Sequence, residues 1–351
     1  MDKRVTENRQ KLVDFIVDKI NNGGVVPWRD PCFNSLPQNA VSGKAYRGMN
    51  NLILSVEALN QGYKDPRWIT FKQAKEKGYH LEKGSKGTMI EFYEFHKPKK
   101  LTEEEKAALK EKGKSDRAIN AIENGYAIIK SYIVFNASQF SNFPELPKNE
   151  EIKTTMERSE DLEKIIKNSE APVFYDATNS NYYSPRRDEV HLRPREHFRN
   201  INDFYSTAMH EIGHSTGHKS RLDRFPEERS RKSYAKEELV AELNSAFINQ
   251  KYNIGISQDQ VEQNASYLHS WAQEIKDDPT FLFKAITQAD QSMRYIEEHM
   301  LNKNKVNEEE PQKTVPNDRI ESPPSTEKKP AQKQGVKFAT RKNKENDGAE
   351  L

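Results

Sequence analysis

Apolar residues in the first half of the chain recur with helical and strand periods. Near the start they return about every 3.6 residues, which predicts an amphipathic helix over residues 4–20. A second helix is expected over residues 52–59, and the segment 70–73 fits a capping box that opens a third. Residues 88–95 and 126–135 are rich in β-branched and aromatic side chains, which predicts two strands.

The stretch between the two predicted strands has a different character. Residues 97–117 are almost all charged, so we expect a solvated excursion that contains an exposed helix over residues 102–110. Residues 1–145 are therefore predicted to form a small mixed α/β domain that carries this excursion. Prolines followed by charged residues predict a linker and a helix over residues 146–167.

Short apolar segments and then longer helical patterns follow, and they predict a second domain over residues 168–301. The expected fold class is therefore α+β. Residues 302–351 have almost no apolar side chains and are predicted to be a disordered tail. The expected strands cover residues 173–175, 182–183 and 189–192, and the expected helices cover residues 203–217, 234–251, 259–276 and 279–301.

Composition narrows the class of protein only a little. The 351 residues carry a formal net charge of +2, so any case for a nucleic-acid partner must come from local patterning. The single cysteine, Cys32, excludes an intrachain disulfide and fits a reducing cytoplasm. No apolar run reaches the roughly 20 residues that cross a bilayer, and residues 1–7 lack the apolar core of a secretion signal. We expect a cytoplasmic protein without a membrane partner.

An HExxH motif at residues 210–214 is the strongest chemical signal in the chain. One helical turn places His210 and His214 on the same face, where two imidazoles can share one metal ion. Glu211 projects from the same rim and is predicted to be the catalytic base that accepts a proton from a metal-bound water. The sequence therefore predicts a site of metallopeptidase type for one divalent ion, Zn²⁺ first, with Mn²⁺ and Co²⁺ also compatible with such ligands.

An acidic helical segment downstream offers the third ligand that a catalytic zinc site takes. We assign Glu238 as this ligand, and Glu242, one turn further on, as the acceptor of a hydrogen bond from the other nitrogen of a ligand histidine. The reverse assignment of these two acids is the alternative. Glu237 is expected to face away, and His218 to lie outside the first ligands, although it is also a candidate third ligand.

Other residues near the motif allow more than one interpretation. HExxH is short and occurs by chance, and two histidines can be ordinary half-buried residues, but an acidic helix within reach argues against chance. We expect Arg221 and Arg224 on a solvated or helix-pairing face. Tyr205, Tyr234 and the nearby arginines are candidates for the donor that stabilises an oxyanion.

Residues 28–86 interleave aromatic rings with cations and amides. Rings stack on unpaired bases, at about 1–3 kcal/mol each, and lysine or arginine neutralises phosphates, so the pattern favours single-stranded DNA over duplex. Packing of the two tryptophans in a core is the alternative interpretation. The candidate DNA-binding residues are Trp28, Tyr46, Arg47, Asn50, Arg67, Trp68, Lys72, Gln73, Lys83 and Lys86.

Several of these blocks resemble one known family. Residues 27–28, 46–50, 66–74 and 83–88 resemble the N-terminal domain of ArdC-type antirestriction proteins. Two later blocks, Phe204-Tyr205-Ser206-Thr207-Ala208-Met209-His210-Glu211-Ile212-Gly213-His214-Ser215-Thr216-Gly217-His218 and Glu237-Glu238-Leu239-Val240-Ala241-Glu242, resemble the zincin-like metallopeptidase half of that family. The resemblance runs over about residues 4–300 in the domain order of the family.

The resemblance implies a protein of plasmids or other conjugative elements that binds single-stranded DNA and protects incoming DNA from host restriction endonucleases. The metal ligands of the family would fall on His210, His214 and one acid of the Glu238/Glu242 pair, with Glu211 as the general base. One departure is Gly213, where the family often carries a bulkier residue, and we expect it to loosen the helix.

Two rival functions remain on the sequence alone. The complete HExxH and acid set fits an active metallopeptidase that cleaves a host or regulatory protein. The N-terminal half alone would fit a passive coating protein for single strands that works with a conjugative primase or relaxase. A regulator that reads duplex sequence is disfavoured, because the chain has no helix-turn-helix or zinc-finger spacing.

Overall fold

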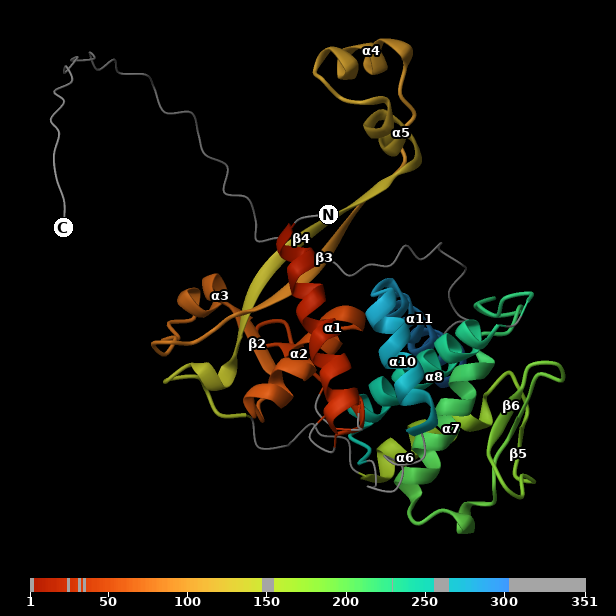
Figure 1. The fold of residues 1–351 in the computed structure, drawn as a ribbon. Coiled ribbons are helices and arrows are strands. Elements are labelled where there is room, and N and C mark those ends of the chain that lie inside the picture. Colours follow the sequence, from red (N-terminus) through yellow and green to blue (C-terminus); the bar gives the residue numbers. More distant parts are fainter. Residues whose placement is uncertain are drawn as a thin grey trace, which may run out of the picture. The chain divides into compact units, whose positions relative to one another are not determined.

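The computed structural model describes residues 3–23, 26–30, 33, 36–146, 155–228, 230–255 and 265–302. Apart from residue 302, the predicted tail lies outside the described residues. Cys32 lies outside them as well. The described residues belong to one compact unit. The α+β class is confirmed, with one sheet in each half of the chain and helices around them (Figure 1).

The first sheet has four strands in the order β1-β2-β4-β3. β1 (Gln38–Asn39) pairs in parallel with β2 (Arg67–Thr70), and β4 (Tyr126–Asn136) pairs antiparallel with both β2 and β3 (Thr88–His96). The two long strands end within one residue of their predicted limits. They form in this region because β-branched and aromatic residues fill both of them.

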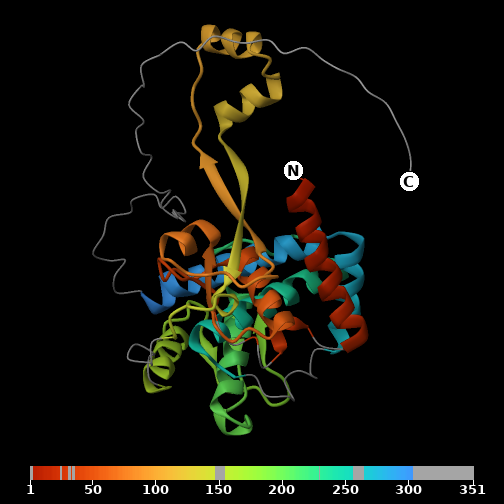
Figure 2. The ribbon, with the colours of Figure 1, turned by 90° about the vertical axis from the view of Figure 1, so that its left-hand side faces the viewer.

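Most of the β3–β4 ribbon has no third strand beside it. Residues 134–136 of β4 pair with β2, whereas residues 126–133 pair with β3 alone. The ribbon extends away from the sheet, and two helices, α4 (Glu103–Glu111) and α5 (Asp116–Asn124), connect its two strands at the far end (Figure 2). The charged excursion was predicted with one exposed helix, and the structure adds a second, which Ser115 caps through the backbone N–H of Ala118.

Helices of the first half flank the sheet and reach toward the second half. The first of them, α1 (Lys3–Gly23), packs against α10 (Ala265–Asp277) of the second half. After the short turn η1 (Pro27–Arg29) comes α2 (Gly48–Gln61), which packs on β3 and also on α11 (Thr280–Ile296). The predicted capping box is confirmed at α3 (Phe71–Glu76), where the Thr70 side chain accepts from the Gln73 N–H.

The second half contains a small sheet and a set of packed helices. The strand order is β5-β7-β6, with β5 at Val173–Phe174, β6 at Tyr182–Ser184 and β7 at Glu189–His191. The central helices are α7 (Ile201–Ser215) and α8 (Arg231–Tyr252). The remaining elements are α6 (Thr155–Lys167), η3 (Arg195–His197), α10, α11 and η4 (Glu297–Leu301), and residues 256–264, where α10 was expected to begin, lie outside the described residues.

One buried apolar core connects the two predicted halves. The same cluster joins Ile16, Trp28 and Leu52 to Phe204 and Trp271. Polar contacts cross between the halves as well, including the buried Asn51–Gln250 hydrogen bond of 2.9 Å. None of the described helices is long and apolar enough to span a membrane.

Candidate metal centre

The HExxH residues lie on α7, which is held tightly against α8. Asn200 caps the start of α7 by accepting from the Asp203 N–H, and the apolar face of the helix is fully buried. Gly213 lies at the point of closest approach, because a Cβ there would be 2.6 Å from Nδ2 of Asn244 on α8. That amide donates to the Met209 carbonyl at 2.9 Å. Gly213 therefore allows the two helices to pack closely, and α7 continues through it to Ser215.

Two histidines of α7 and one glutamate of α8 bring their ligand atoms together. The candidate ligand atoms of His210, His214 and Glu238 all lie within 4.8 Å of one another. The carboxylate of Glu238 lies 3.8 Å from Nε2 of His210 and 3.6 Å from Nε2 of His214. Two imidazoles and a carboxylate at such spacing are a donor set that divalent transition ions accept. The structure thus groups the three predicted ligands.

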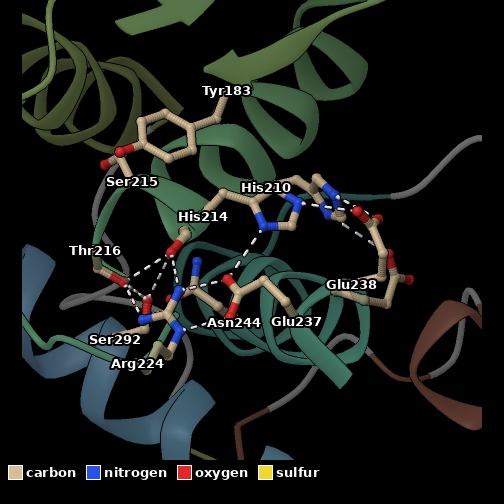
Figure 3. A network of polar contacts seen from close by, with 12 residues as sticks. Tyr183, His210, His214, Ser215, Thr216, Arg224, Glu237, Glu238, Asn244 and Ser292 are labelled. Carbon is tan, nitrogen blue, oxygen red and sulfur yellow. Dashed lines mark hydrogen bonds and ion pairs between the residues drawn. The ribbon is translucent and has the colours of Figure 1, made fainter. Parts of the chain in front are cut away.

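A second carboxylate stands behind His214. Oε1 of Glu237 lies 3.2 Å from Nδ1 of His214, and Arg224 donates to both oxygens of that carboxylate at 2.8 and 2.9 Å (Figure 3). The expectation that Glu237 faces away was wrong. Neighbouring helical residues diverge by about 100°, and the imidazole lies between them, so Glu238 meets one ring nitrogen and Glu237 the other.

A third carboxylate, that of Glu242, lies beside His210 and is held by an arginine from the N-terminal half of the chain. Oε2 of Glu242 lies 3.7 Å from Nδ1 of His210. Arg29, in η1, donates to both oxygens of Glu242, with Nη2 2.6 Å from Oε2. Glu242 therefore approaches the histidine from the side opposite Glu238, where an outer carboxylate orients a ligand ring.

These acids set the charge of the centre. Burial lowers the pKa of His210, but Glu238, Glu211 and Glu242 outweigh it and raise that pKa to about 9. Burial raises the pKa of Glu238, but the two histidines outweigh it and bring that pKa to about 2. The carboxylates thus stabilise positive charge between them, and a divalent cation would take over this role by displacing the proton of His210.

The centre opens into a cavity of about 610 Å³. Glu211 lines it, as do Asn181, Arg193 and the edge strand residue Tyr182. Of the two tyrosines considered as oxyanion donors, Tyr234 lines the cavity and hydrogen bonds to Glu238. The other donates to Glu163 at 2.8 Å and is not among the lining residues.

Residues just after α7 close the end of that helix. Arg221 Nε donates to the Ser215 carbonyl at 2.7 Å, and Arg224 Nη2 donates to the Gly213 carbonyl at 2.6 Å. Both arginines are almost fully buried, so the expectation of a solvated face was wrong. The last carbonyl groups of a helix have no N–H partner within the helix, and these two guanidinium groups donate hydrogen bonds to two of them. His218 lies outside the ligand cluster, with Nδ1 2.8 Å from the Ser220 hydroxyl.

The aromatic residues predicted to bind DNA are core residues. Trp28 and Trp68 are each 1% exposed, and Tyr46 is buried beside Asn39. Their rings present no free face to a base, so the alternative interpretation of core packing is the one that the structure supports for them.

Most of the polar residues in the same set hold the fold together. Asn50 caps the edge of β3 by bonding both backbone groups of Glu91, at 2.6 and 2.8 Å. Arg47 pairs with Glu297, Arg67 with Asp65 and the Pro144 carbonyl, and Gln73 with its capping partner. The residues of the set that remain exposed are Lys72, Lys83 and Lys86.

Comparison with known proteins finds one family model in each half of the chain. Residues 6–135 match the family model described as the N-terminal domain of anti-restriction factor ArdC, and residues 160–288 match the one described as a zincin-like metallopeptidase. Two proteins of Escherichia coli named DNA primase TraC are 30% and 32% identical over 82% of this chain. The chain spans only 27% and 19% of their lengths. An uncharacterized protein, y4eC, of Sinorhizobium fredii is 30% identical over 90% of its length.

Solved structures agree with these matches. The antirestriction ArdC protein from plasmid R388 in its Mn(II)-bound form has 30% identity and a TM-score of 0.64, over 84% of this chain and 98% of that one. Its metal-free form has 31% identity and a TM-score of 0.67, over 86% and 99%. A divalent metal is therefore the ion class to expect in the cluster on α7 and α8. Both halves match in order and nearly the whole relative is covered, so this chain belongs to the ArdC family of antirestriction proteins.

Proposed function

We propose that this chain is an antirestriction protein of a conjugative or other mobile element. It binds single-stranded DNA with its N-terminal half and holds one divalent metal ion in its zincin-like half. The observation that carries the proposal is the clustering of His210, His214 and Glu238 in a chain that matches both parts of the ArdC family. The protein partners that fit this role are a host restriction endonuclease or another protein substrate.

The residues around the centre have distinct roles in this proposal. His210, His214 and Glu238 hold the ion, which is Zn²⁺, Mn²⁺ or Co²⁺, and the ion supplies Lewis acidity and lowers the pKa of a bound water. Glu211 lines the same cavity and accepts a proton there. Tyr234 orients Glu238 by a hydrogen bond.

A transfer assay tests the antirestriction role. Unmethylated DNA enters a restricting host by conjugation, and the recovery of transferred DNA is compared with and without the intact chain. We expect the chain to raise recovery in a restricting host and to leave it unchanged in a host without the restriction system. Equal loss of DNA with and without the protein would remove the proposal.

A second candidate function is proteolysis of a specific protein, and the position of Glu211 favours it. A buried carboxylate beside the cluster, in a cavity bordered by the edge strand β6, is more than a binding protein needs. Glu211→Gln removes the base but none of the three ligands, so it should keep the ion and abolish cleavage. If this variant still protects DNA fully, proteolysis is not how protection works.

Metal content of the purified chain tests the assigned ligands. We expect one equivalent of metal per chain after dialysis against Zn²⁺, Mn²⁺ or Co²⁺, and less than a tenth of an equivalent in the His210→Ala/His214→Ala variant. Stoichiometric metal in the double variant would place the ion elsewhere.

A further inference from the structure

The β3–β4 ribbon and its two helices form a structure that we call the arm, residues 88–136. Figure 2 shows β3 and β4 running from the sheet to α4 and α5. The strands of the arm carry large exposed rings, in contrast to the buried tryptophans of the same half. Tyr126 is 36% exposed, Tyr132 44% and Phe95 62%.

Strand register sorts these rings onto two faces. Ile90 lies opposite Tyr132, Phe92 opposite Lys130, and His96 opposite Tyr126, so these side chains share one face. On it the His96 and Tyr126 rings stack with centroids 4.5 Å apart, and Phe92 meets Tyr132 edge-on at 6.3 Å. We call Phe92, His96, Tyr126, Lys130 and Tyr132 the ring face.

The opposite face is partly occupied by α1. It carries Tyr93 and Phe95, and Arg9 of α1 donates to the Tyr93 hydroxyl at 2.6 Å. Arg9 also makes a two-pronged ion pair with the buried carboxylate of Glu91 on the same face. On β4 the residues of the ring side, at positions 126, 128, 130 and 132, are all exposed, whereas residues 129 and 131 of the opposite side are half-buried. The ring side of β4 is therefore open to a ligand.

The arm also carries an excess of cations that have no acidic partner. Lys99, Lys106, Lys110 and Lys130 each form an ion pair inside the arm. Among the described residues, only Glu104 and Glu111 of the arm carboxylates lack a cation. The cations of the arm without an ion pair among the described residues are Lys97, Lys100, Lys112, Lys114 and Arg117.

We propose that the arm is the surface that binds single-stranded DNA, with unpaired bases stacked on the ring face and phosphates held by the unpaired cations. The proposal rests on the single-strand binding proposed above and assigns that binding to one surface of the chain. Tyr126 and Tyr132 are six residues apart on one strand, or about 20 Å, the length of at most about six nucleotides at the rise of a stacked strand.

The chemistry of the face favours nucleic acid over a protein partner. Protein interfaces concentrate apolar residues in a continuous core and are depleted in lysine. Here the Lys130–Glu94 ion pair lies between the two pairs of rings, and the unpaired cations of the arm follow in residues 97–117, beyond the end of β3. Rings spaced along a cationic track are what sequence-tolerant single-strand binders use.

Binding of a labelled oligothymidylate to the intact protein tests the proposal. We expect the double variant Tyr126→Ala/Tyr132→Ala to bind at least about tenfold more weakly than the unchanged chain. Phe95→Ala removes a more exposed ring from the opposite face and is the matched control, with an expected change of less than about twofold. Lys97→Gln/Lys100→Gln should flatten the dependence of affinity on salt between about 50 and 200 mM.

The possible results separate the arm from the proposed function. Melting temperature and metal content are measured for every variant, and both should match the unchanged chain because the substituted side chains are exposed. If the chain binds single strands and the ring-face variant binds as well, the arm proposal is overturned and the proposed function stands. If the chain binds no single strands at all, both fail. If the ring-face variant instead dissociates an oligomer of this chain, a second copy occupies the face and the arm proposal is overturned.

Discussion

Each histidine of the centre has an outer carboxylate that an arginine holds, and the two arginines come from different parts of the chain. Behind His214, Glu237 is held by Arg224, which lies a few residues beyond the end of α7. Behind His210, Glu242 is held by Arg29, which comes from η1 in the other half of the chain. One side of the centre is thus complete within the zincin-like half, and the other side is completed by the N-terminal half.

The comparison teaches that the two halves are not independent modules. The core is continuous through both, and an outer residue of the metal centre lies across the boundary between them. A ligand on the N-terminal half that moved η1 would act on His210 through Glu242. The predictions below test each side of the centre in turn, beginning with the largest expected effect.

Arg224→Met should have the largest effect, because it removes one hydrogen-bond donor from each of three groups. Glu237 stays buried beside His214, and the carbonyl of Gly213 and the hydroxyl of Thr216 lose a hydrogen bond each. Breaking such a buried pair costs about 3–5 kcal/mol of unfolding free energy, and loss of an outer carboxylate partner weakens metal binding about 10- to 100-fold. Urea denaturation and metal competition with a chelator measure the two effects. A variant as stable as the unchanged chain would contradict this account of Arg224.

Arg29→Met tests the side that crosses between the halves. We expect metal affinity to fall about tenfold, with a loss of about 3 kcal/mol in unfolding free energy, since Arg29 is slightly more exposed than Arg224.

Arg47→Met is the matched control for this substitution. Arg47 also joins the halves, through Glu297, but is more exposed and does not line the metal cavity. It should cost less than about 1 kcal/mol and leave metal affinity unchanged. Equal losses of metal affinity in both variants would show that Arg29 acts only by joining the halves.

Gly213→Ala tests the close packing that positions both sides. The added Cβ would lie 2.6 Å from Nδ2 of Asn244, so we expect a loss of about 1–3 kcal/mol in unfolding free energy. Asn244→Ala removes the obstructing amide, and the double variant should therefore lose less than the two single losses combined. Strict additivity in urea denaturation would mean that the two side chains do not meet.

A pH-dependent effect on stability, with no direct effect on metal binding, is expected from Asp188, which lies outside the ligand cluster. Burial raises the pKa of Asp188, but Arg221 and Tyr183 outweigh it and hold that pKa below its ordinary value of 3.8. A lowered pKa means that the stabilisation is fully present above about pH 4 and is lost as the pH falls further. Asp188→Asn keeps a side chain that tolerates the positive φ of 57° found there. It should cost about 2 kcal/mol at pH 7 and progressively less below pH 4, as acid denaturation series would show.

Helical periodicity was enough to predict that His210 and His214 lie together, because their spacing depends only on one turn of one helix. The role of Glu237 could not be predicted in this way, since it depends on how α8 approaches α7. The contact between Arg29 and Glu242 was even harder to predict from the sequence. It lies more than 200 residues from Glu242 in sequence, and a lone arginine after a tryptophan has no local signature of such a contact.

The three rings predicted to bind DNA are buried, and the sequence could not show their burial for a different reason. Interleaved rings and cations look the same in sequence whether a tryptophan fills a core or faces solvent, and Trp28 and Trp68 fill the core. Exposed rings lie instead on β3 and β4, which were correctly predicted as strands but lie outside the segment, residues 28–86, from which the candidate DNA-binding residues were taken. Only the last residues of β4 pair with β2. Which strands pair depends on the tertiary structure, so the local sequence does not show that the rest of the ribbon is uncovered.

Anomalous diffraction from crystals of the intact chain grown with Mn²⁺ tests the central claim most directly. We predict one peak within bonding distance of Nε2 of His210, Nε2 of His214 and a carboxylate oxygen of Glu238, with Glu242 still paired to Arg29. A peak ligated by Glu242 or His218 in place of Glu238, or no peak between α7 and α8, would contradict it.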